Sequence, residues 1–424
     1  MLEPIYYANV ILSFLLFFAN YDYVRKKWHL KIINPLLLLL AVYLPTVFAP
    51  IYLGPLVLIE NGFLNDHYQF AVLVTNVSLV FSLLSSVFFF RFILKIKGVE
   101  LFFLRVYSYS PRKSSIRWAE FFFLSLSLLL FVAMAQSGFG LLNWLVSPRT
   151  GYQYHRDGVG SLFALSLTFL SVAYCLAFLG RRSIGSFIIK SLLYLTVVYF
   201  WGSKGFIISF GMFFILCLYF AKYRHLKTTI LFSLPAIFGL VVYNLYTALG
   251  SVSYIDVLSY FDHYRNSGMY YEAYQDGRIG LFYGEIMMSD FWSLIPRAIY
   301  PDKPYVYGIY IINEILFPGM TEIGQTPAFG GPVKYFADFG FFSVIIFAFF
   351  NISYWVKLYL LNFYFRGSEL GVDFSRNILF VLIFCICFAP AFLSYIPGSL
   401  GFLLVLIIWI FLGFVSRLKI SENV

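Results

Sequence analysis

The sequence predicts an all-α polytopic integral membrane protein with about 11 transmembrane helices, and three observations support this fold class. Hydrophobic residues make up 61% of the 424 residues, whereas charged residues make up only 12%. Many apolar runs exceed about 18 residues, which is long enough to cross a hydrocarbon core of ~30 Å as a helix. These runs are continuously apolar rather than alternating, and they therefore favour helices over the strands of a membrane barrel.

The predicted helices follow one another along the chain, separated by short connections and one long loop. Their approximate ranges are 4–22, 33–58, 69–90, 118–136, 161–179, 185–201, 205–221, 229–248, 334–356, 377–395 and 399–415. This pattern divides the chain into transmembrane helices one to eight (1–248), a large loop with short helices (249–333) and helices nine to eleven (334–424). No Lys or Arg precedes the first run and no small-residue cleavage site follows it, so we expect no cleavable signal peptide.

The Lys and Arg residues alternate between the two sides of the predicted membrane. One set of connections holds 22 of the 30; the other set holds Arg149, Arg156, Lys204, Arg265, Arg278, Arg297, Lys303 and Lys334. Because cytoplasmic loops are enriched in Lys and Arg, the first set is expected inside and the second outside. The N-terminus and the loop 249–333 are therefore expected outside, and the C-terminus inside. The net charge of +10 does not indicate a nucleic-acid partner, because the positive charge flanks the spans.

Several signatures of other functions are missing from the sequence. It has no P-loop, no Gly-rich dinucleotide turn and no metal-ligand spacing of His and Cys. The four cysteines lie inside apolar runs, which is typical of buried packing thiols. No internal repeat is evident and charges in the middle of the spans are nearly missing, which argues against an ion-coupled transporter. We therefore expect neither a cofactor nor a bound metal.

The outer cations are candidate ligands for phosphate groups. Lys204 lies in the Gly-Ser-Lys-Gly turn at 202–205, where small residues would let a phosphate approach the backbone. The alternative is a snorkelling lysine that ends a span. Arg297 and Lys303 lie in the proline-framed run 296–304, which would hold both residues rigidly. A guanidinium can fork onto two phosphate oxygens, and the remaining candidates are Arg149, Arg156, Arg265 and Arg278.

The loop 249–333 is the richest in polar and aromatic residues. It holds four bases, nine acids and eleven tyrosines. Tyrosine rings suit the apolar faces of sugars, and they suit the membrane interface equally well. Six prolines exclude one continuous helix, but short helices are expected at about 256–274 and at 304–316, where Pro304 would occupy the first turn.

A general base is the least determined part of the predicted site. The outer histidines are His67, His155 and His263, and the last two each lie beside an aspartate and an arginine in the sequence. One base with a pKa near the operating pH is enough to activate a hydroxyl, and a loop carboxylate could serve as well. For each histidine, a hydrogen-bonded structural role is the alternative.

The architecture and three short stretches resemble the O-antigen polymerase family, the Wzy-type oligosaccharide repeat-unit polymerases. These stretches are the turn at 202–205, IPRAIYPDKP at 295–304 and KYFADFG at 334–340. The resemblance implies a GT-C-like glycosyltransferase plan in the bacterial inner membrane. It also implies that the substrates are oligosaccharide repeat units linked to undecaprenyl diphosphate and presented in the periplasm. Membrane lipids and a chain-length regulator protein are the other expected partners.

The resemblance also assigns roles to residues of this chain. Lys204 matches the basic position of the short turn, and Arg297 and Lys303 match those of the proline-framed stretch. The catalytic candidates are Arg297, Lys303, Arg278 and His263, and the candidate diphosphate ligands are Lys204, Arg149, Arg156 and Arg265.

Three other functions remain as alternatives. One is an O-antigen ligase, a class in which the large loop tends to carry a His followed by Asn or Ser, whereas Tyr264 follows His263 here. The others are a lipid-linked oligosaccharide flippase or other transporter, and a non-catalytic membrane subunit.

Overall fold

The computed structural model describes residues 2–27, 66–92, 113–155, 160–221, 223–249, 263–295, 300–321, 327–329, 332–343 and 345–346. These residues form helices and irregular segments, and no strand occurs among them. They fall into two compact units. Unit 1 comprises Met1–Lys95 with Leu249–Trp355, and unit 2 comprises Ile96–Ala248 with Val356–Val424.

Seven predicted spans fall on the described residues, and each coincides with a helix. The segments Pro4–Tyr23, Asp66–Ser85, Ser114–Gly138 and Leu162–Leu179 are long and apolar enough to cross a membrane. Shorter apolar helices cover Ile184–Tyr199, Gly205–Ile215 and Leu226–Ile237. The predicted class, an all-α polytopic membrane protein, is therefore confirmed. The number of about 11 spans stays a prediction, because 33–58, 377–395 and 399–415 lie outside the described residues.

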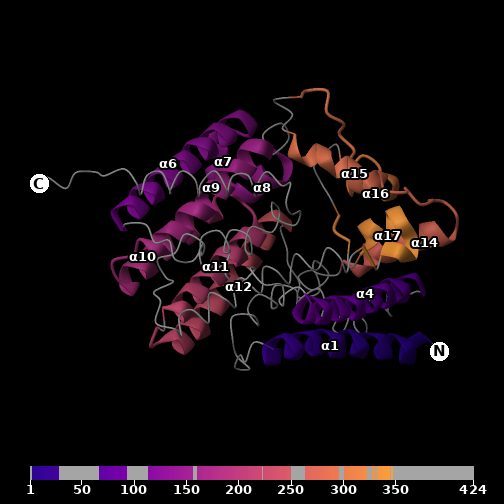
Figure 1. Cartoon of the computed structure of the whole chain (residues 1–424). Helices are drawn as coiled ribbons and strands as arrows, with labels where there is room; N and C mark the ends of the chain where they lie inside the picture. Colours follow the sequence, from indigo (N-terminus) through magenta and orange to yellow (C-terminus); the bar gives the residue numbers. More distant parts are fainter. Residues whose placement is uncertain are drawn as a thin grey trace, which may run out of the picture. The chain divides into compact units, whose positions relative to one another are not determined.

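In unit 1, helix α1 (Leu2–Lys27) runs side by side with α4 (Asp66–Arg91) (Figure 1). Buried polar side chains join the two helices. The amide of Asn76 donates to the carbonyl of Asn9 at 3.0 Å, and the Ser13 hydroxyl donates to the amide oxygen of Asn76. Hydrogen bonds of this kind hold helices together in lipid, where hydrophobic association gives little drive.

Helix α14 (Tyr264–Gln275) from the long loop packs against the start of α4. A Cβ placed on Gly268 would lie 3.2 Å from the backbone of Tyr68, so the glycine permits a close approach. The Tyr68 ring lies 6.3 Å from the Tyr6 ring and 6.2 Å from the Tyr264 ring, measured between centroids. The beginnings of α1, α4 and α14 thus lie together at one end of unit 1.

The rest of the long loop forms several short helices. They are α15 (Glu285–Ser289), the 3-10 helix η3 (Asp290–Leu294), α16 (Tyr310–Leu316), α17 (Val333–Phe339) and the 3-10 helix η4 (Gly340–Phe342). The helix predicted at 256–274 is confirmed from 264 onward, and 256–262 lies outside the described residues. The helix predicted at 304–316 begins instead at Tyr310. The reason is that Gly308 adopts a φ of +57° and its N–H donates to the Ser289 hydroxyl at 2.8 Å, which ties this segment to α15.

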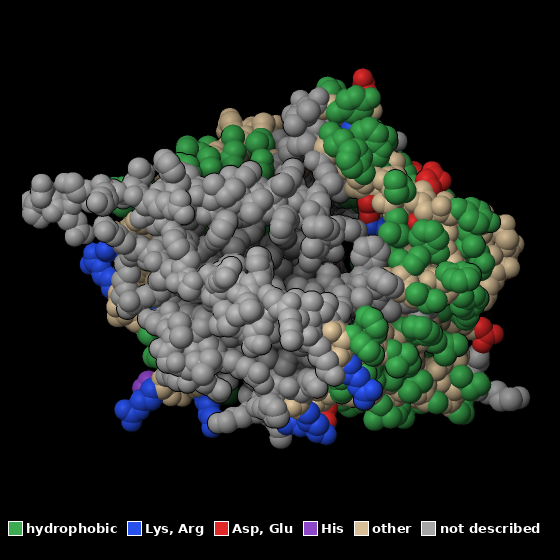
Figure 2. Space-filling view, in the orientation of Figure 1, with side chains coloured by type: hydrophobic (Ala, Val, Ile, Leu, Met, Phe, Trp, Pro, Cys, Tyr) green, Lys and Arg blue, Asp and Glu red, His purple; other side chains and the backbone are tan. Residues whose placement is uncertain are grey.

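The span predicted at 334–356 begins with α17, whose residues belong to the core of unit 1. The ring of Phe336 lies 4.9 Å from that of Tyr271 and 5.4 Å from that of Tyr274. Helix α17 ends at Phe339, and Gly340 follows with a φ of +55°. The first turns of the predicted span are therefore a short, separately packed helix. Figure 2 shows hydrophobic side chains over much of the described surface beside these short helices.

Unit 2 contains α6 (Lys113–Gly138), α9 (Gly160–Leu179), α10 (Ile184–Tyr199), α11 (Lys204–Phe220) and α12 (Leu226–Leu249). Two short helices, α7 (Leu141–Val146) and α8 (Pro148–Tyr154), connect α6 to α9 (Figure 1). Helices α6 and α9 pack along much of their length. The Ser127 hydroxyl donates to the Ser166 carbonyl at 2.6 Å, and the rings of Phe123 and Phe169 stack at 5.7 Å.

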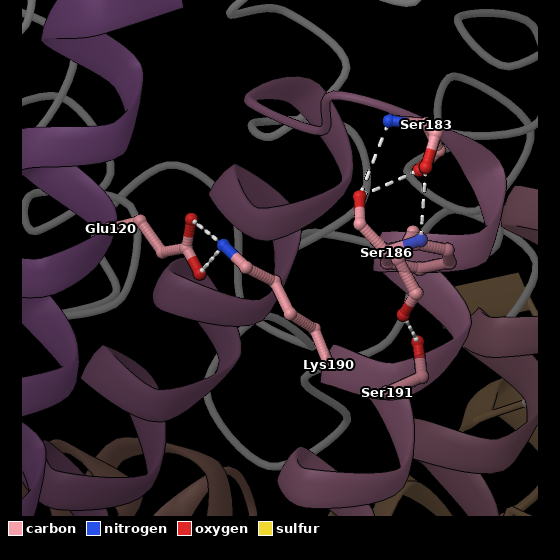
Figure 3. Close-up of polar contacts among 6 residues, drawn as sticks. Glu120, Ser183, Ser186, Lys190 and Ser191 are labelled. Carbon is pink, nitrogen blue, oxygen red and sulfur yellow. Dashed lines mark hydrogen bonds and ion pairs between the residues drawn. The ribbon is translucent and has the colours of Figure 1, made fainter.

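An ion pair joins α6 to α10 within unit 2. The Lys190 ammonium lies 2.6 Å from both carboxylate oxygens of Glu120, and the Glu120 side chain is nearly buried (Figure 3). A reciprocal pair of hydrogen bonds between Ser183 and Ser186 begins α10, as Figure 3 also shows. The beginnings of α6 and α10 are therefore held together.

Candidate functional site

The Gly-Ser-Lys-Gly turn lies against the start of α8 in unit 2. Gly202 adopts a φ of +71°, and a Cβ placed on it would lie 2.1 Å from the carbonyl oxygen of Pro148. Glycine is therefore the residue that fits this position, both for its backbone angle and for its lack of a side chain. Lys204 is the first residue of α11 rather than the centre of the turn. The reason is that the carbonyl of Ser203 already accepts from the N–H groups of Phe206 and Ile207.

Arg149 is the predicted phosphate ligand that the structure brings to this turn. Its Nη1 donates to the carbonyl oxygen of Gly202 at 3.3 Å, and its guanidinium lies 5.2 Å from the centroid of the Tyr152 ring. Its Nε atom is buried and has no hydrogen-bond partner among the described residues. A half-buried guanidinium thus lies beside the turn from which Lys204 starts α11.

Trp144 fixes the short helix α7 against the same turn. The indole N–H donates to the carbonyl of Phe200 at 2.9 Å, and the side chain is completely buried. Gly151 of α8 lies beneath the ring, because a Cβ placed there would meet the indole at 2.6 Å. Trp201, the residue after Phe200, donates its indole N–H to the Ser166 hydroxyl at 2.9 Å. Two tryptophans that look like ordinary interfacial residues in the sequence therefore build the support of the site.

The remaining candidates of the first outer segment are His155 and Arg156. The His155 ring stacks on the Phe139 ring, with centroids 4.0 Å apart and planes at 12°. This contact agrees with the structural alternative for this histidine. Arg156 lies outside the described residues.

Unit 1 contains the candidates of the long loop. The ammonium of Lys303 donates to the Ile295 carbonyl at 3.1 Å and lies 4.4 Å from the centroid of the Tyr307 ring. Its side chain is buried. The Trp292 ring stacks on the Tyr300 ring at 5.6 Å. The Lys303 contact joins the two ends of the proline-framed stretch, and the Trp292–Tyr300 contact joins its middle to η3. Arg297 lies between these ends, in the segment 296–299 outside the described residues.

The other three candidates lie on or near α14. Arg278 is exposed and pairs with the Asp276 carboxylate at 3.0 Å and with Glu272 at 3.9 Å. Arg265 is exposed on the first turn of the helix. His263 immediately precedes α14, and its carbonyl accepts from the N–H of Ser267. The structure therefore places the candidates in two sets, with Arg149 and Lys204 in unit 2 and the described loop residues in unit 1.

The described tyrosines of the loop range from buried through half-buried to exposed. Tyr264, Tyr270 and Tyr271 pack in the core of unit 1, where burial raises the pKa of the last two phenols. Tyr283, Tyr300 and Tyr305 are exposed. The sugar-binding interpretation thus applies to the exposed group, since the buried rings have the packing role that the sequence also allowed.

Asp338 and Lys334 are structurally important residues to which the sequence assigned no role. The buried carboxylate of Asp338 accepts from the N–H groups of Ile286 at 3.0 Å and Met287 at 2.8 Å. Lys334 forms an ion pair with Asp290. Both residues belong to the KYFADFG stretch. The signal in the sequence was an aspartate between apolar residues, which could have indicated a buried carboxylate that caps the start of a helix. No group of three or more His, Cys, Asp or Glu able to hold a metal occurs among the described residues.

The chain is similar to curated O-antigen polymerases from Salmonella typhimurium (strain LT2) and from Salmonella typhi. Each is 30% identical over 266 residues, a stretch that spans 62% of this chain and 62% of the relative. No protein-family model matches the chain, and no solved structure matches it. The similarity to these two proteins confirms the resemblance to the O-antigen polymerase family that the sequence indicates.

Proposed function

We propose that the chain is a glycosyltransferase of the bacterial inner membrane that polymerises oligosaccharide repeat units linked to undecaprenyl diphosphate. The growing chain would move from its lipid diphosphate to the incoming lipid-linked unit on the periplasmic side. Two findings support the proposal. One is the similarity to two O-antigen polymerases, and the other is the contact of Arg149 with the Gly-Ser-Lys-Gly turn.

The contact of Arg149 with the turn is the observation that carries the proposal. A guanidinium has five N–H donors, and the Gly202 carbonyl accepts from Nη1 alone in the described contact. The remaining N–H groups of the guanidinium can then donate to phosphate oxygens, while the Gly202 carbonyl and the Tyr152 ring hold the side chain in place. The charge of Lys204, two residues after Gly202, would add to the same anion site.

The chemistry requires a leaving group and a base. A bond forms between an acceptor hydroxyl oxygen and the anomeric carbon, while the bond from that carbon to the diphosphate oxygen breaks. The negative charge that develops on the diphosphate is stabilised by fixed cations, so this step does not require a metal ion. The hydroxyl proton passes to a base, for which His263 remains the candidate of the long loop.

The candidate cations of the long loop have different roles in the proposed reaction. Lys303 connects the Ile295 carbonyl with the Tyr307 ring, which favours a positioning role for this lysine over direct contact with the diphosphate. Arg297, in the stretch that Lys303 closes, stays the candidate cation of the loop. Arg278 is already paired with two carboxylates and exposed, so it ranks below Arg297.

The lipopolysaccharide ladder of a deletion strain, complemented with variants, tests the proposal. Without the gene, the cores should carry a single repeat unit. Loss of all capping would indicate a ligase, and accumulation of units on the inner leaflet would indicate a flippase. Arg149→Ala should shorten the chains, because removal of one charge-assisted donor slows such reactions by about 100- to 1,000-fold. Arg149→Lys should recover in part.

Arg182→Ala is the matched control. Arg182 is an exposed arginine of unit 2 on the predicted cytoplasmic side, and its loss should leave long chains. Equal ladders for Arg149→Ala and Arg182→Ala at equal protein levels would refute the assignment of Arg149.

A further inference from the structure

Helix α10 connects the ion pair near its beginning with the candidate site at its end. Lys190, in the second turn of the helix, lies 2.6 Å from both carboxylate oxygens of Glu120 in α6 (Figure 3). The helix continues to Tyr199, whose carbonyl accepts from the N–H of Gly202 at 2.9 Å. A hydrogen-bonded backbone therefore runs without a break from Lys190 to the Gly-Ser-Lys-Gly turn, over ~18 Å at the helical rise.

The end of α10 supplies two carbonyl groups to the candidate site. The Phe200 carbonyl accepts from the Trp144 indole, and the Gly202 carbonyl accepts from the Arg149 guanidinium at 3.3 Å. The height of α10, by which we mean its position along its own axis, therefore decides where both carbonyls lie relative to α7 and α8. A shift of ~1 Å away from α8 would lengthen the Arg149 hydrogen bond beyond its range.

The apolar contacts of α10 hold the helix in unit 2 without fixing this height. The rings of Phe187 and Tyr194 stack on the Tyr174 ring of α9, with centroids 5.9 and 4.8 Å apart. Apolar contacts are non-directional, so a small shift along the axis changes their energy little. With 16 residues, or ~24 Å, α10 is also shorter than a hydrocarbon core of ~30 Å, so its length does not set its depth.

The ion pair is the contact that depends steeply on the height of α10. The Glu120 side chain is only 9% exposed, and a carboxylate in a membrane-spanning helix is costly once it loses its partner. A shift of one helical turn, ~5.4 Å, would break both contacts with Lys190. The best-attested use of such a pair is to specify register, because the desolvation of two charges offsets much of their attraction.

We propose that Glu120 and Lys190 are positioning residues for the transferase reaction. The pair sets the height of α10, and α10 in turn sets the position of the Gly202 carbonyl that holds Arg149. This inference rests on the proposed function and deepens it, since it assigns a role in the reaction to an ion pair ~18 Å from the turn.

A double variant that removes both charges tests the inference. In Glu120→Leu with Lys190→Met neither charge is left alone, so the protein should accumulate and its midpoint of thermal unfolding should not fall. Because the height of α10 is no longer fixed, the purified protein should extend lipid-linked units about 100-fold more slowly, the effect of a misplacement of ~1 Å. Lys190→Arg keeps the charge pair and should extend units as wild type does, since this side chain is 36% exposed and has space for a guanidinium.

Spin labels measure the height of α10 independently of activity. Nitroxides are attached to cysteines at Leu129 of α6 and Leu193 of α10, which are 68% and 62% exposed, in a background in which alanine replaces the native four cysteines. We expect the distribution of distances between the labels to shift or broaden in the double variant and to stay unchanged in Lys190→Arg. The matched control, Asp22→Leu with Lys26→Met, removes an ion pair between two residues of α1 and should leave distance and rate unchanged.

Each contrary result has a definite meaning. An unchanged distance distribution, a wild-type rate, or failure of the double variant to accumulate would overturn the inference, because the pair would then not set the register of the site. Arg149→Ala separates this failure from failure of the proposed function. If Arg149→Ala slows extension but the double variant does not, the inference alone is wrong. If Arg149→Ala extends units as wild type does, the proposed anion site fails, and the positioning role fails with it.

Discussion

The sharpest prediction concerns Gly202, because its surroundings leave no space for a side chain. In Gly202→Ala the new Cβ would lie 2.1 Å from the Pro148 carbonyl oxygen and 2.6 Å from the carbonyl carbon. The atoms it meets belong to the backbone and cannot rotate away. In addition, the φ of +71° places an alanine in the left-handed region, which costs about 1–2 kcal/mol for a residue with a Cβ.

The magnitude of the effect follows from the displacement. The contact must open from 2.1 Å to at least 3.0 Å, the limit below which Cβ contacts essentially do not occur, so the turn and α8 must separate by about 0.9 Å. The hydrogen bond from Arg149 to the Gly202 carbonyl, already 3.3 Å long, would then exceed the hydrogen-bond range. A misplacement of about 1 Å in a site that positions reactants lowers the rate by about 100-fold.

The assay compares Gly202→Ala with Gly205→Ala in the same turn. A Cβ on Gly205 would meet its nearest neighbour, the Ser203 hydroxyl, at 4.0 Å, so that variant should behave as wild type. We expect Gly202→Ala to shorten the polysaccharide ladder and to lower the midpoint of thermal unfolding of the purified protein, with Gly205→Ala unchanged in both. A wild-type ladder and midpoint for Gly202→Ala would refute the close approach of the turn to α8.

Three further predictions follow. Cysteines introduced near Tyr274 and Ile309, in a background without the native four, should react with an impermeant thiol reagent in cells with a permeabilised outer membrane; labelling only after lysis at both sites would contradict a periplasmic loop. Purified protein should extend lipid-linked units in excess chelator, and activity that a divalent cation alone restores would show a metal requirement. Asp338→Asn should lower the free energy of unfolding by about 1–3 kcal/mol, because a buried carboxylate that accepts two N–H groups is lost. Thermal unfolding with exposed Asp276→Asn as the control measures this effect, and equal midpoints would contradict the cap.

The helices of the membrane region could be predicted from the sequence because their signal is local. Continuous apolar runs of about 18 residues have few alternatives in lipid, so 118–136 and 161–179 coincide with α6 and α9. The short helices of the loop have no such signal. Proline is common at the first position of a helix, and Pro304 therefore predicted a helix start. Helix α16 nevertheless begins at Tyr310, because Gly308 is held by a hydrogen bond to Ser289 from another part of the loop.

The candidate site was predictable in its residue types more than in its geometry. Scarcity of outer cations placed Arg149 and Lys204, which are far apart in the sequence, among the candidate phosphate ligands, but it did not rank Arg149 above the others. Their common location depends on Trp144 and Gly202, whose contacts are tertiary and leave no pattern in the sequence. The same holds for Lys303, whose proline frame suggested a rigid cation while its bond to the Ile295 carbonyl indicates a positioning role.

The packing within each unit agrees with the alternation of spans that the charge count predicts, and which side is the periplasm stays a prediction. In unit 1, the contact of Tyr68 with Tyr6 and Tyr264 joins three segments that the count assigns to the outside. In unit 2, the bond from Arg149 to Gly202 joins two more outer segments. Two segments can be in contact at the membrane surface only if they lie on the same side of the membrane. If one span had been missed or added between two of these contacting segments, the charge count would have placed one of them inside and the other outside. The alternation of Lys and Arg between loops and the contacts of aromatic and glycine residues have different physical origins, so their agreement is a reason to seek the chemistry at these two ends.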